Sequence, residues 1–290
     1  MRYRRIGRGA SAVRVSAIGL GEMPLSLRGR PDEEQAVRTI HASLDAGVTL
    51  IDTADAYCEG SHDVGHGERL VAKALSTYGG DTSDVLVATK GGHLRYEDGG
   101  WYVDGRPDYI KRACDASLKA LGVDAIGLYQ HHRPDPKVPY ADTIGALRDL
   151  LDAGKIRLAG ISNANVEQIE QADEILGGRL ASVQNQFAPN FRSSEGELRH
   201  TRERGIAFLP WSPLGGIGNA DEIERKFPAF AQVARERGVS PQQVTLAWML
   251  AKGDNVIPIP GSSRPETAVA SAAAADIELT ADEVTRLDTA

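Results

Sequence analysis

Four side chains in this sequence could together move a proton. Asp52, Lys90 and His132 lie at the ends of three short apolar runs, and Tyr57 follows Asp52 by five residues. A phenol is a weak acid at pH 7, but a neighbouring ammonium stabilises tyrosinate and lowers the pKa of the phenol. Lys90 could supply that charge, and Asp52 could hold Lys90 in place. The expected chemistry is proton donation from Tyr57 to a carbonyl oxygen that His132 orients.

Each of these residues also has an ordinary structural explanation. Asp52 and Lys90 could form a structural ion pair, Tyr57 could anchor a loop, and a lone histidine is often a core side chain with its hydrogen bonds satisfied. Successive side chains on a strand face opposite ways, so at most one of His131 and His132 can point into a shared site. The combination of the four residues is more specific than any one of them.

The elements that must position these side chains alternate along the chain. Short apolar runs with few polar residues are typical of parallel strands buried on both faces. They are Val15–Leu20, Thr49–Asp52, Val85–Thr89, Ala125–Tyr129, Ile156–Ile161, Ala181–Gln184, Ile206–Leu209 and Val256–Ile259. Capping patterns predict helices between them at Asp32–Ala46, Pro107–Leu121, Tyr140–Ala153, Asn165–Leu176, Ser194–Arg204 and Pro241–Leu250. About eight such units predict an α/β fold, a (β/α)8 TIM barrel, whose strand ends meet at one face.

Both ends of the chain extend this barrel. Tyr3–Val13 precedes the first predicted barrel strand, and we expect an N-terminal β-hairpin that closes the barrel floor. Thr280–Leu287 predicts an extra C-terminal helix, which a Thr-x-x-Glu capping box opens. No linker or change in composition divides the chain, so we expect a single domain over residues 1–290.

Two long segments follow the third and seventh predicted strands. They are Gly91–Arg106 and Ser212–Phe227, and segments of this length at the C-terminal face of a barrel often bind substrate. The aromatic content of the first one favours a carbonyl substrate with apolar or ring character. The candidate substrate-binding residues are Met23, His93, Trp101 and Tyr102.

Composition narrows the class of protein further. Hydrophobic residues make 41% and charged residues 25% of the chain, with a net charge of −7, which is typical of a globular protein and argues against a nucleic-acid binder. No apolar run approaches the ~18 residues of a membrane span. With two cysteines and no secretory signal, the cytoplasm is the expected location. Cys58, His62 and His66 are regularly spaced, but the glycines among them argue against a zinc site, so no metal is expected.

The catalytic pattern resembles the aldo-keto reductase family. The resemblance is carried by Gly47–Tyr57, Val87–Lys90 and Leu118–Asp124, with Leu128–Asp135 after them, and it covers essentially the whole chain. It implies that Asp52, Tyr57, Lys90 and His132 form the family's catalytic tetrad, and the register of Arg133-Pro-Asp favours His132 over His131. It also implies an NADPH-dependent reductase of aldehydes or ketones that is a monomer or a weak homo-oligomer.

No Gly-x-Gly-x-x-Gly pattern of a Rossmann fold is present, because Pro24 stands where the third glycine would follow Gly19 and Gly21. The resemblance implies instead that Ser162, Asn163 and Gln184 hold the nicotinamide amide and that Trp211 stacks on the ring. Judged alone, Ser162 and Asn163 could equally cap the next helix. The full set of candidate cofactor-binding residues is Ser162, Asn163, Gln184, Trp211, Ser212, Leu214, Gly261, Ser262, Ser263 and Arg264.

The segment Ile259–Glu266 resembles the family's phosphate-binding segment. Ser263 and Glu266 have the spacing of a capping box at a helix start, and helix N-termini favour anions. Arg264 would pair with the 2′-phosphate of NADP(H). The family's basic or amide residues are replaced by Gly261 and Thr267, and its Glu-Asn pair is replaced by Ala270-Ser271. NAD(H) therefore remains possible beside NADP(H).

Two other functions remain open at this stage. The chain could be a nucleotide-binding regulatory or sensor subunit of the same fold with little turnover, although the intact tetrad argues against it. A phosphate-handling barrel lyase or isomerase would leave the positions of Tyr57 and Trp211 without a reason.

Overall fold

Parallel strands form a curved wall that positions everything else in the molecule. The computed structural model describes residues 1–216, 218–220 and 222–290. The strands of the wall, in spatial order, are β3 (Leu20–Gly21), β4 (Leu50–Asp52), β5 (Leu86–Gly91), β8 (Ile126–His131), β9 (Ile156–Ser162), β10 (Leu180–Gln184) and β11 (Ala207–Phe208). Their spatial order follows the chain and each neighbouring pair is parallel. The predicted barrel fold is confirmed.

An eighth segment closes the wall without forming a regular strand. The prediction of a strand at Val256–Ile259 was wrong in this respect, because Pro258 and Pro260 have no N–H to donate. The backbone N–H groups of Gly19 and Gly21 nevertheless donate to the carbonyls of Pro258 and Pro260, each at 2.9 Å. On the other side Ile257 donates to the Phe208 carbonyl at 2.9 Å. The segment therefore joins the first and last strands of the wall.

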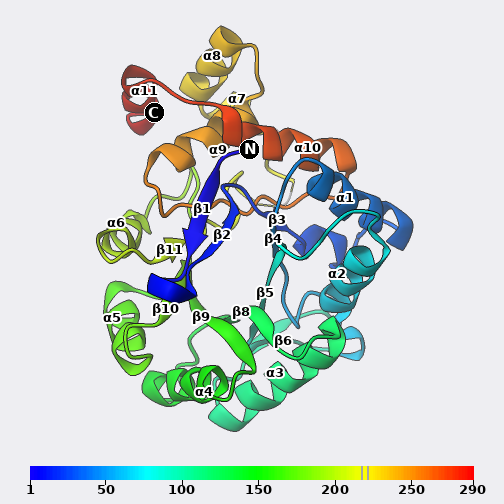
Figure 1. The fold of residues 1–290 in the computed structure, drawn as a ribbon. Helices are drawn as coiled ribbons and strands as arrows, with labels where there is room; N and C mark the ends of the chain where they lie inside the picture. The colour runs from blue at the N-terminus through cyan, green and yellow to red at the C-terminus, as the bar shows by residue number, and fades with distance from the viewer. Residues whose placement is uncertain (217, 221) are drawn as a thin grey trace.

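Helices cover the outside of this wall (Figure 1). The outer helices are α1 (Glu33–Asp45), α2 (His66–Thr77), α3 (Pro107–Leu121), α4 (Tyr140–Asp152), α5 (Val166–Ile175), α6 (Glu195–Glu203), α9 (Pro241–Ala251) and α10 (Pro265–Ala273). The helix starts and stops predicted from capping patterns agree to within about a residue. Two short helices, α7 (Glu222–Lys226) and α8 (Pro228–Arg237), were not predicted. The C-terminal helix α11 (Ala281–Asp288) has the predicted capping box between Thr280 and Glu283.

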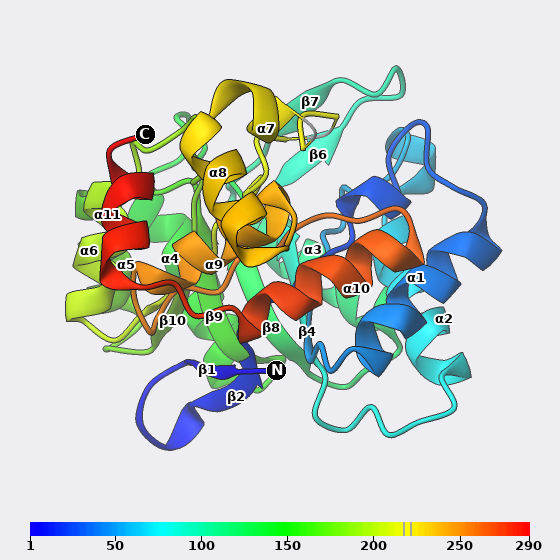
Figure 2. The same ribbon diagram turned by 90° about the horizontal axis from the view of Figure 1, so that it is seen from above.

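The N-terminal hairpin is longer than predicted and takes residues from the first expected barrel strand. Strands β1 (Tyr3–Ile6) and β2 (Val13–Ser16) pair antiparallel and lie at the face opposite β6 and β7 (Figure 2). The predicted strand Val15–Leu20 is therefore split between the hairpin and β3. The Ser16 hydroxyl donates to the Ile18 carbonyl at 2.7 Å and accepts from the Thr49 N–H at 2.9 Å, which bends the chain between the two.

The two long segments at the C-terminal face contain structure of their own. Gly91–Arg106 includes a second antiparallel hairpin of β6 (His93–Arg95) and β7 (Trp101–Val103). Ser212–Phe227 contains α7, although positions 217 and 221 lie outside the described residues. The face that carries both segments is at the top of Figure 2.

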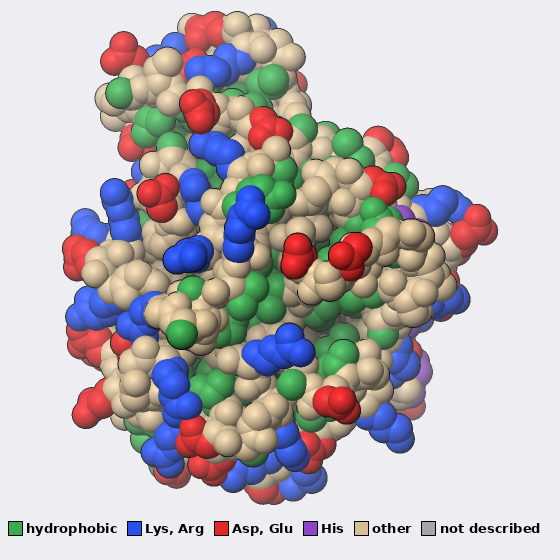
Figure 3. All heavy atoms as spheres, in the orientation of Figure 1, with side chains coloured by type: hydrophobic (Ala, Val, Ile, Leu, Met, Phe, Trp, Pro, Cys, Tyr) green, Lys and Arg blue, Asp and Glu red, His purple; other side chains and the backbone are tan. Residues whose placement is uncertain are grey.

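Apolar side chains fill both sides of the wall. Leu50, Leu128, Leu158 and Ile257 point into the barrel interior and form one buried cluster. A larger cluster lies between the strands and helices α3–α9, with Trp248 stacked on Phe187 at 5.4 Å. This packing on both faces explains why the strand sequences are continuously apolar. On the face drawn in Figure 3, acidic and basic side chains are interspersed. Within the described residues, no helix combines the length and apolarity that a bilayer crossing requires.

Gly91 on β5 packs closely against Tyr129 on β8, and substitutions at these two positions test how this contact affects stability. An added Cβ at Gly91 would overlap the buried Tyr129 hydroxyl, which has no hydrogen-bond partner among the residues that the structure describes. We expect Gly91→Ala to lower the free energy of unfolding by about 1–3 kcal/mol through overpacking. Tyr129→Phe, which removes that oxygen, should recover part of the loss in the double variant. Urea unfolding monitors both effects, and additive losses in the double variant would rule out this contact as the cause.

Candidate active site

Asp52, Lys90 and Tyr57 meet in a buried cluster at the C-terminal ends of β4 and β5. Asp52 ends β4, and Lys90 precedes the last residue of β5. Lys90 Nζ lies 2.6 Å from Asp52 Oδ1 and 3.2 Å from the Tyr57 hydroxyl, and it donates to the Thr53 carbonyl at 2.8 Å. Lys90 has no exposed surface. All three ammonium protons therefore have an oxygen acceptor, which a buried cation requires.

Burial reverses the predicted direction of the Tyr57 shift. Tyr57 is 7% exposed, and this burial raises the pKa of the phenol above its ordinary value, although the Lys90 ammonium acts to lower it. Burial also opposes the charge of Lys90, but Asp52 and Tyr57 together leave the pKa of Lys90 raised. The expectation of a lowered Tyr57 pKa was wrong for this state, because residue spacing contains no measure of burial. The resting cluster holds a protonated phenol against a charged ammonium.

Two glutamine amides hold the second oxygen of Asp52. Gln184 Nε2, at the end of β10, donates to Asp52 Oδ2 at 2.8 Å, and Gln130 Nε2, on β8, does so at 3.4 Å. The Ser182 hydroxyl in turn donates to Gln130 Oε1 at 3.2 Å. Gln184 was predicted to bind cofactor, whereas Gln130 was not predicted at all. A glutamine directly after an apolar run was the only signal for it.

The two adjacent histidines separate to opposite sides of the wall. His132 lies edge-on to Tyr57 with ring centres 5.8 Å apart, and His93 lies 4.9 Å from it. His131 is fully buried and lies 5.9 Å from the Tyr140 ring on the other side. Burial lowers the pKa of His132 well below its ordinary value, and it lowers the pKa of His131 to about 4. His132 is therefore a neutral imidazole beside Tyr57.

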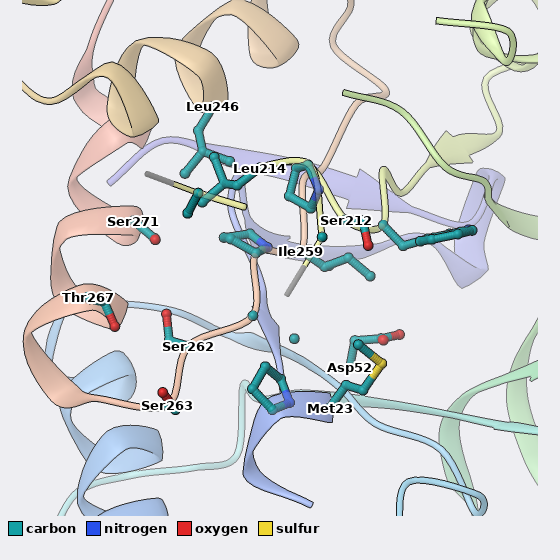
Figure 4. A pocket seen from close by; sticks show the side chains of 18 of the residues that line it. Met23, Asp52, Ser212, Leu214, Leu246, Ile259, Ser262, Ser263, Thr267 and Ser271 are labelled. Carbon is teal, nitrogen blue, oxygen red and sulfur yellow. The ribbon is translucent and has the colours of Figure 1, made fainter. Parts of the chain in front are cut away.

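One cavity of about 1070 Å³ unites most of the predicted residues. All ten candidate cofactor residues line it, together with Asp52, Tyr57 and His132. Figure 4 shows Ser262, Ser263, Thr267 and Ser271 at one end of this cavity, away from Asp52 and Ser212. Lys90 lies behind the lining, where Asp52 and Tyr57 separate it from the cavity. The volume suits a ligand larger than an ordinary drug-sized molecule.

Ser162 and Asn163 do not cap the next helix. The N-cap of α5 is Asn165, whose side chain forms a reciprocal capping box with Gln168. The Ser162 hydroxyl donates to the Gln184 carbonyl at 2.7 Å, and Asn163 Nδ2 donates to the His132 carbonyl at 3.0 Å. Asn163 has a φ of 58°, in the left-handed region. Such an outlier commonly marks a functional position.

The start of α10 differs from the predicted capping box. Arg264 is the N-cap and Pro265 is the first helical residue, so Ser263 lies one position too early to cap the helix. No side chain caps this end, which leaves its first N–H groups without an intrahelical partner. The Arg264 side chain is 62% exposed, and its Nε lies 3.5 Å from Glu266 Oε1. The Ser263 carbonyl accepts from Gln35 Nε2 at 2.8 Å, which ties this segment to α1.

Three of the four candidate substrate residues line the cavity, namely Met23, His93 and Trp101. His93 and Trp101 stack across the β6–β7 hairpin with ring centres 4.4 Å apart. Tyr102 stacks on Tyr96 at 4.4 Å instead and does not contribute to the lining. The alternation of side chains along β7 places these neighbouring aromatic residues on opposite faces of the hairpin.

Several lining residues were not predicted. Gln242, Gln243 and Leu246 come from α9, and Arg133 follows His132. The Ser240–Gln243 capping box at the start of α9 was a readable signal for a helix start near the site. Arg133 belonged to a motif that was used only to choose between the two histidines.

Cys58 and His66, two residues of the regularly spaced set Cys58, His62 and His66, contact groups of the protein itself. The Cys58 thiol donates to the backbone carbonyls of Ala56 and Gly60, and His66 Nδ1 lies 2.8 Å from the Ser26 hydroxyl. No cluster of three or more potential metal-binding side chains occurs among the residues described.

Three buried carboxyl groups lie behind the Lys90 cluster. Glu22 accepts from Thr53 Oγ1 at 2.9 Å and bonds Ser26, while Glu68 accepts from Thr89 Oγ1 at 2.7 Å. Burial raises the pKa of Glu22 to about 8, and it raises the pKa of Glu68 and of Asp55 as well. At neutral pH Glu22 is thus mostly protonated, and it adds little negative charge to the cluster.

Known proteins similar to this chain include members of one enzyme family and other oxidoreductases. Residues 17–290 match the Aldo/keto reductase family. The chain is 34% identical to a 6-dehydroglucose reductase of Novosphingobium aromaticivorans, over 90% of this chain and 86% of the relative. A thermostable aldo-keto reductase in complex with the inhibitor epalrestat superposes with a TM-score of 0.84 at 28% identity, covering 100% of this chain and 99% of that one. An aldo-keto reductase from Klebsiella pneumoniae in complex with NADPH has a TM-score of 0.80 at 27% identity, covering 100% and 95%.

The raised pKa of Glu22 predicts a pH-dependent stability. The pKa rises from 4.5 to about 8 on burial, so between these values the folded protein holds a proton that the unfolded chain has lost. The contribution of Glu22 to stability is therefore full below about pH 4.5 and is lost as pH rises towards 8, by a few kcal/mol in order of magnitude. Glu22→Gln should flatten this fall in urea unfolding at pH 5, 6.5 and 8. The exposed Glu174→Gln should not change it, and parallel curves for wild type and Glu22→Gln would contradict the assignment.

Proposed function

The chain belongs to the aldo/keto reductase family of oxidoreductases, and we propose that it reduces an aldehyde or ketone to an alcohol with hydride from NADPH. The observation that carries this proposal is the position of the Lys90 ammonium, 2.6 Å from Asp52 and 3.2 Å from the Tyr57 hydroxyl. Neutral His132 stands beside Tyr57 at the edge of the same cavity. These side chains together could donate a proton to a carbonyl oxygen.

In the proposed reaction Tyr57 donates its hydroxyl proton to the carbonyl oxygen. The raised pKa of the buried phenol keeps that proton in place until a substrate oxygen gains negative charge. Lys90 then stabilises the tyrosinate that remains, and Asp52 keeps Lys90 charged and fixed. Because the pKa of His132 is lowered, its ring is neutral and can donate one hydrogen bond to the substrate oxygen without adding a competing acid. The two side chains together form a site for a developing oxyanion.

The residues along the cavity have the chemistry that a nicotinamide dinucleotide requires. When bound, the cofactor supplies the hydride. Trp211 offers a ring face, and Ser162, Asn163 and Gln184 supply hydroxyl and amide groups for the carboxamide. The uncapped start of α10 and the hydroxyls of Ser262 and Ser263 suit a phosphate group.

The charge of Arg264 favours NADPH over NADH. Its side chain lines the phosphate end of the cavity, and among the described residues its one ion-pair partner is the exposed Glu266. Gly261, Thr267, Ala270 and Ser271 add no further charge there. The proposed preference for NADPH thus depends mainly on one exposed side chain.

The proposed role of Tyr57 predicts a selective loss of chemistry. In Tyr57→Phe the Lys90–Asp52 pair and the cavity remain, but the transferable proton is gone. We expect NADPH binding to be retained and kcat to fall by about 10²- to 10⁴-fold in an assay of cofactor oxidation over a panel of carbonyl compounds. Tyr3→Phe on the floor hairpin should keep full activity. Unchanged turnover in Tyr57→Phe would refute the mechanism, and cofactor binding without any turnover in the wild type would favour a sensor.

Arg264→Ala should separate the two cofactors. Loss of a charged hydrogen bond to the 2′-phosphate would raise the KM for NADPH by about 10-fold, the small value expected at an exposed site. The KM for NADH, which has no such phosphate, should stay the same. The control Arg199→Ala removes an exposed arginine on α6, away from the cavity. Equal effects on both cofactors would remove the argument for a preference.

A further inference from the structure

A cationic side chain faces the cavity next to the proposed proton donor. Arg133 follows His132 directly and lines the cavity with Tyr57, His93 and Trp101. Its guanidinium lies 5.9 Å from the centre of the Trp211 ring. The side chain is half-buried, and no hydrogen bond or ion pair of Arg133 occurs among the residues that the structure describes.

The other groups at this end of the cavity carry no net charge. Asp52 is neutralised by Lys90 at 2.6 Å. Burial and the nearby Arg133 lower the pKa of His93 to about 4, and burial with Lys90 lowers the pKa of His132. Besides Asp52, which Lys90 neutralises, and Arg133, the only charged side chain among the described lining residues is Arg264, at the phosphate end. Arg133 is thus an uncompensated positive charge where the substrate would lie.

A guanidinium in this position suits an anion on the substrate. Partial burial removes part of its hydration, and burial lowers the pKa of Arg133 accordingly. An arginine fork binds carboxylate or phosphate oxygens through two parallel hydrogen bonds. The stacked His93 and Trp101 rings form an apolar wall beside it. The same cavity therefore combines a site for a carbonyl oxygen at Tyr57 and His132 with one for an anion.

We propose that the substrate is an aldehyde or ketone that also carries a carboxylate or phosphate group, and that Arg133 binds this group. This proposal rests on the proposed carbonyl reduction and adds the class of substrate to it. Arg133 acts as a specificity-determining residue, because it contacts the part of the substrate that does not react.

Matched substrate pairs test the proposal. The pairs are 4-carboxybenzaldehyde against methyl 4-formylbenzoate, succinic semialdehyde against butanal, and glyceraldehyde 3-phosphate against glyceraldehyde. We expect wild-type kcat/KM to favour the anionic member of at least one pair by about 10- to 100-fold, the effect of one charged hydrogen-bonded contact. The second and third pairs distinguish a carboxylate from a phosphate. Arg133→Gln should bring this ratio close to one, mainly through KM, and Arg133→Lys should restore part of it.

Controls separate this effect from general damage. Arg199→Gln should keep the wild-type ratio, and quenching of tryptophan fluorescence by NADPH reports cofactor affinity in each variant. A wild-type ratio near one in all pairs would overturn the proposal. So would an Arg133→Gln variant that binds NADPH more weakly and slows both members of a pair equally, because Arg133 would then serve the cofactor.

A binding measurement tests the anion site separately from the proposed reaction. If no carbonyl is reduced, calorimetry with 4-(hydroxymethyl)benzoate and 4-(hydroxymethyl)benzamide still tests the anion site in the presence of NADPH. Tighter binding of the carboxylate that disappears in Arg133→Gln would support the anion site without the reaction. Equal binding of the two compounds would reject it.

Discussion

The contact between Lys90 and Asp52 constrains the whole C-terminal face. A fully buried ammonium is stable only if an opposite charge and further acceptors surround it. The structure meets this demand with Asp52 Oδ1, the Thr53 carbonyl and the Tyr57 hydroxyl, and it holds the other oxygen of Asp52 with Gln184 and Gln130. Lys90 and Asp52 come from the neighbouring strands β5 and β4, and the two glutamines come from β10 and β8, so the full set of contacts requires all four strands to be in register. The proposed proton transfer and the assembly of the barrel thus depend on the same atoms.

Burial shifts the pKa values of ionisable groups on both sides of the Lys90–Asp52 pair towards their neutral forms. Behind the pair, Glu22, Glu68 and Asp55 are carboxyl groups whose raised pKa values favour the neutral form. In front of it His132 and His93 are neutral, since burial lowers the pKa of each. The formal charges close to the reacting position are therefore Lys90, Asp52 and Arg133. A negative charge that develops on a substrate oxygen in the proposed reaction would lie close to these side chains.

Features that depend on residues close together in the sequence were predicted well, whereas features that depend on contacts between distant segments were not. Capping patterns such as Thr280 with Glu283 identified helix ends, because the partners are three residues apart. The convergence of Asp52, Lys90 and His132 was predicted from the order of parallel strands, and Tyr57 was expected on the loop just after Asp52. The split of Val15–Leu20 between the hairpin and β3 depends on a hydrogen bond from the Thr49 N–H to Ser16, thirty-three residues away. The depth of Tyr57 and the amide contacts of Asp52 likewise arise only when distant segments pack. The roles of the site residues remain proposals that geometry supports.

The eighth segment also has a consequence for how the molecule responds to its ligand. The seam between β3 and this segment depends on backbone bonds from Gly19 and Gly21 to Pro258 and Pro260, since the prolines can only accept. Gly21 also forms a parallel bridge with Gly261 at this seam. Gly261–Ser263 directly follow it and line the phosphate end of the cavity. A dinucleotide bound in this cavity, as proposed, would contact Gly21 and Gly261–Ser263 on the two sides of this seam, so binding would also stabilise the closed barrel.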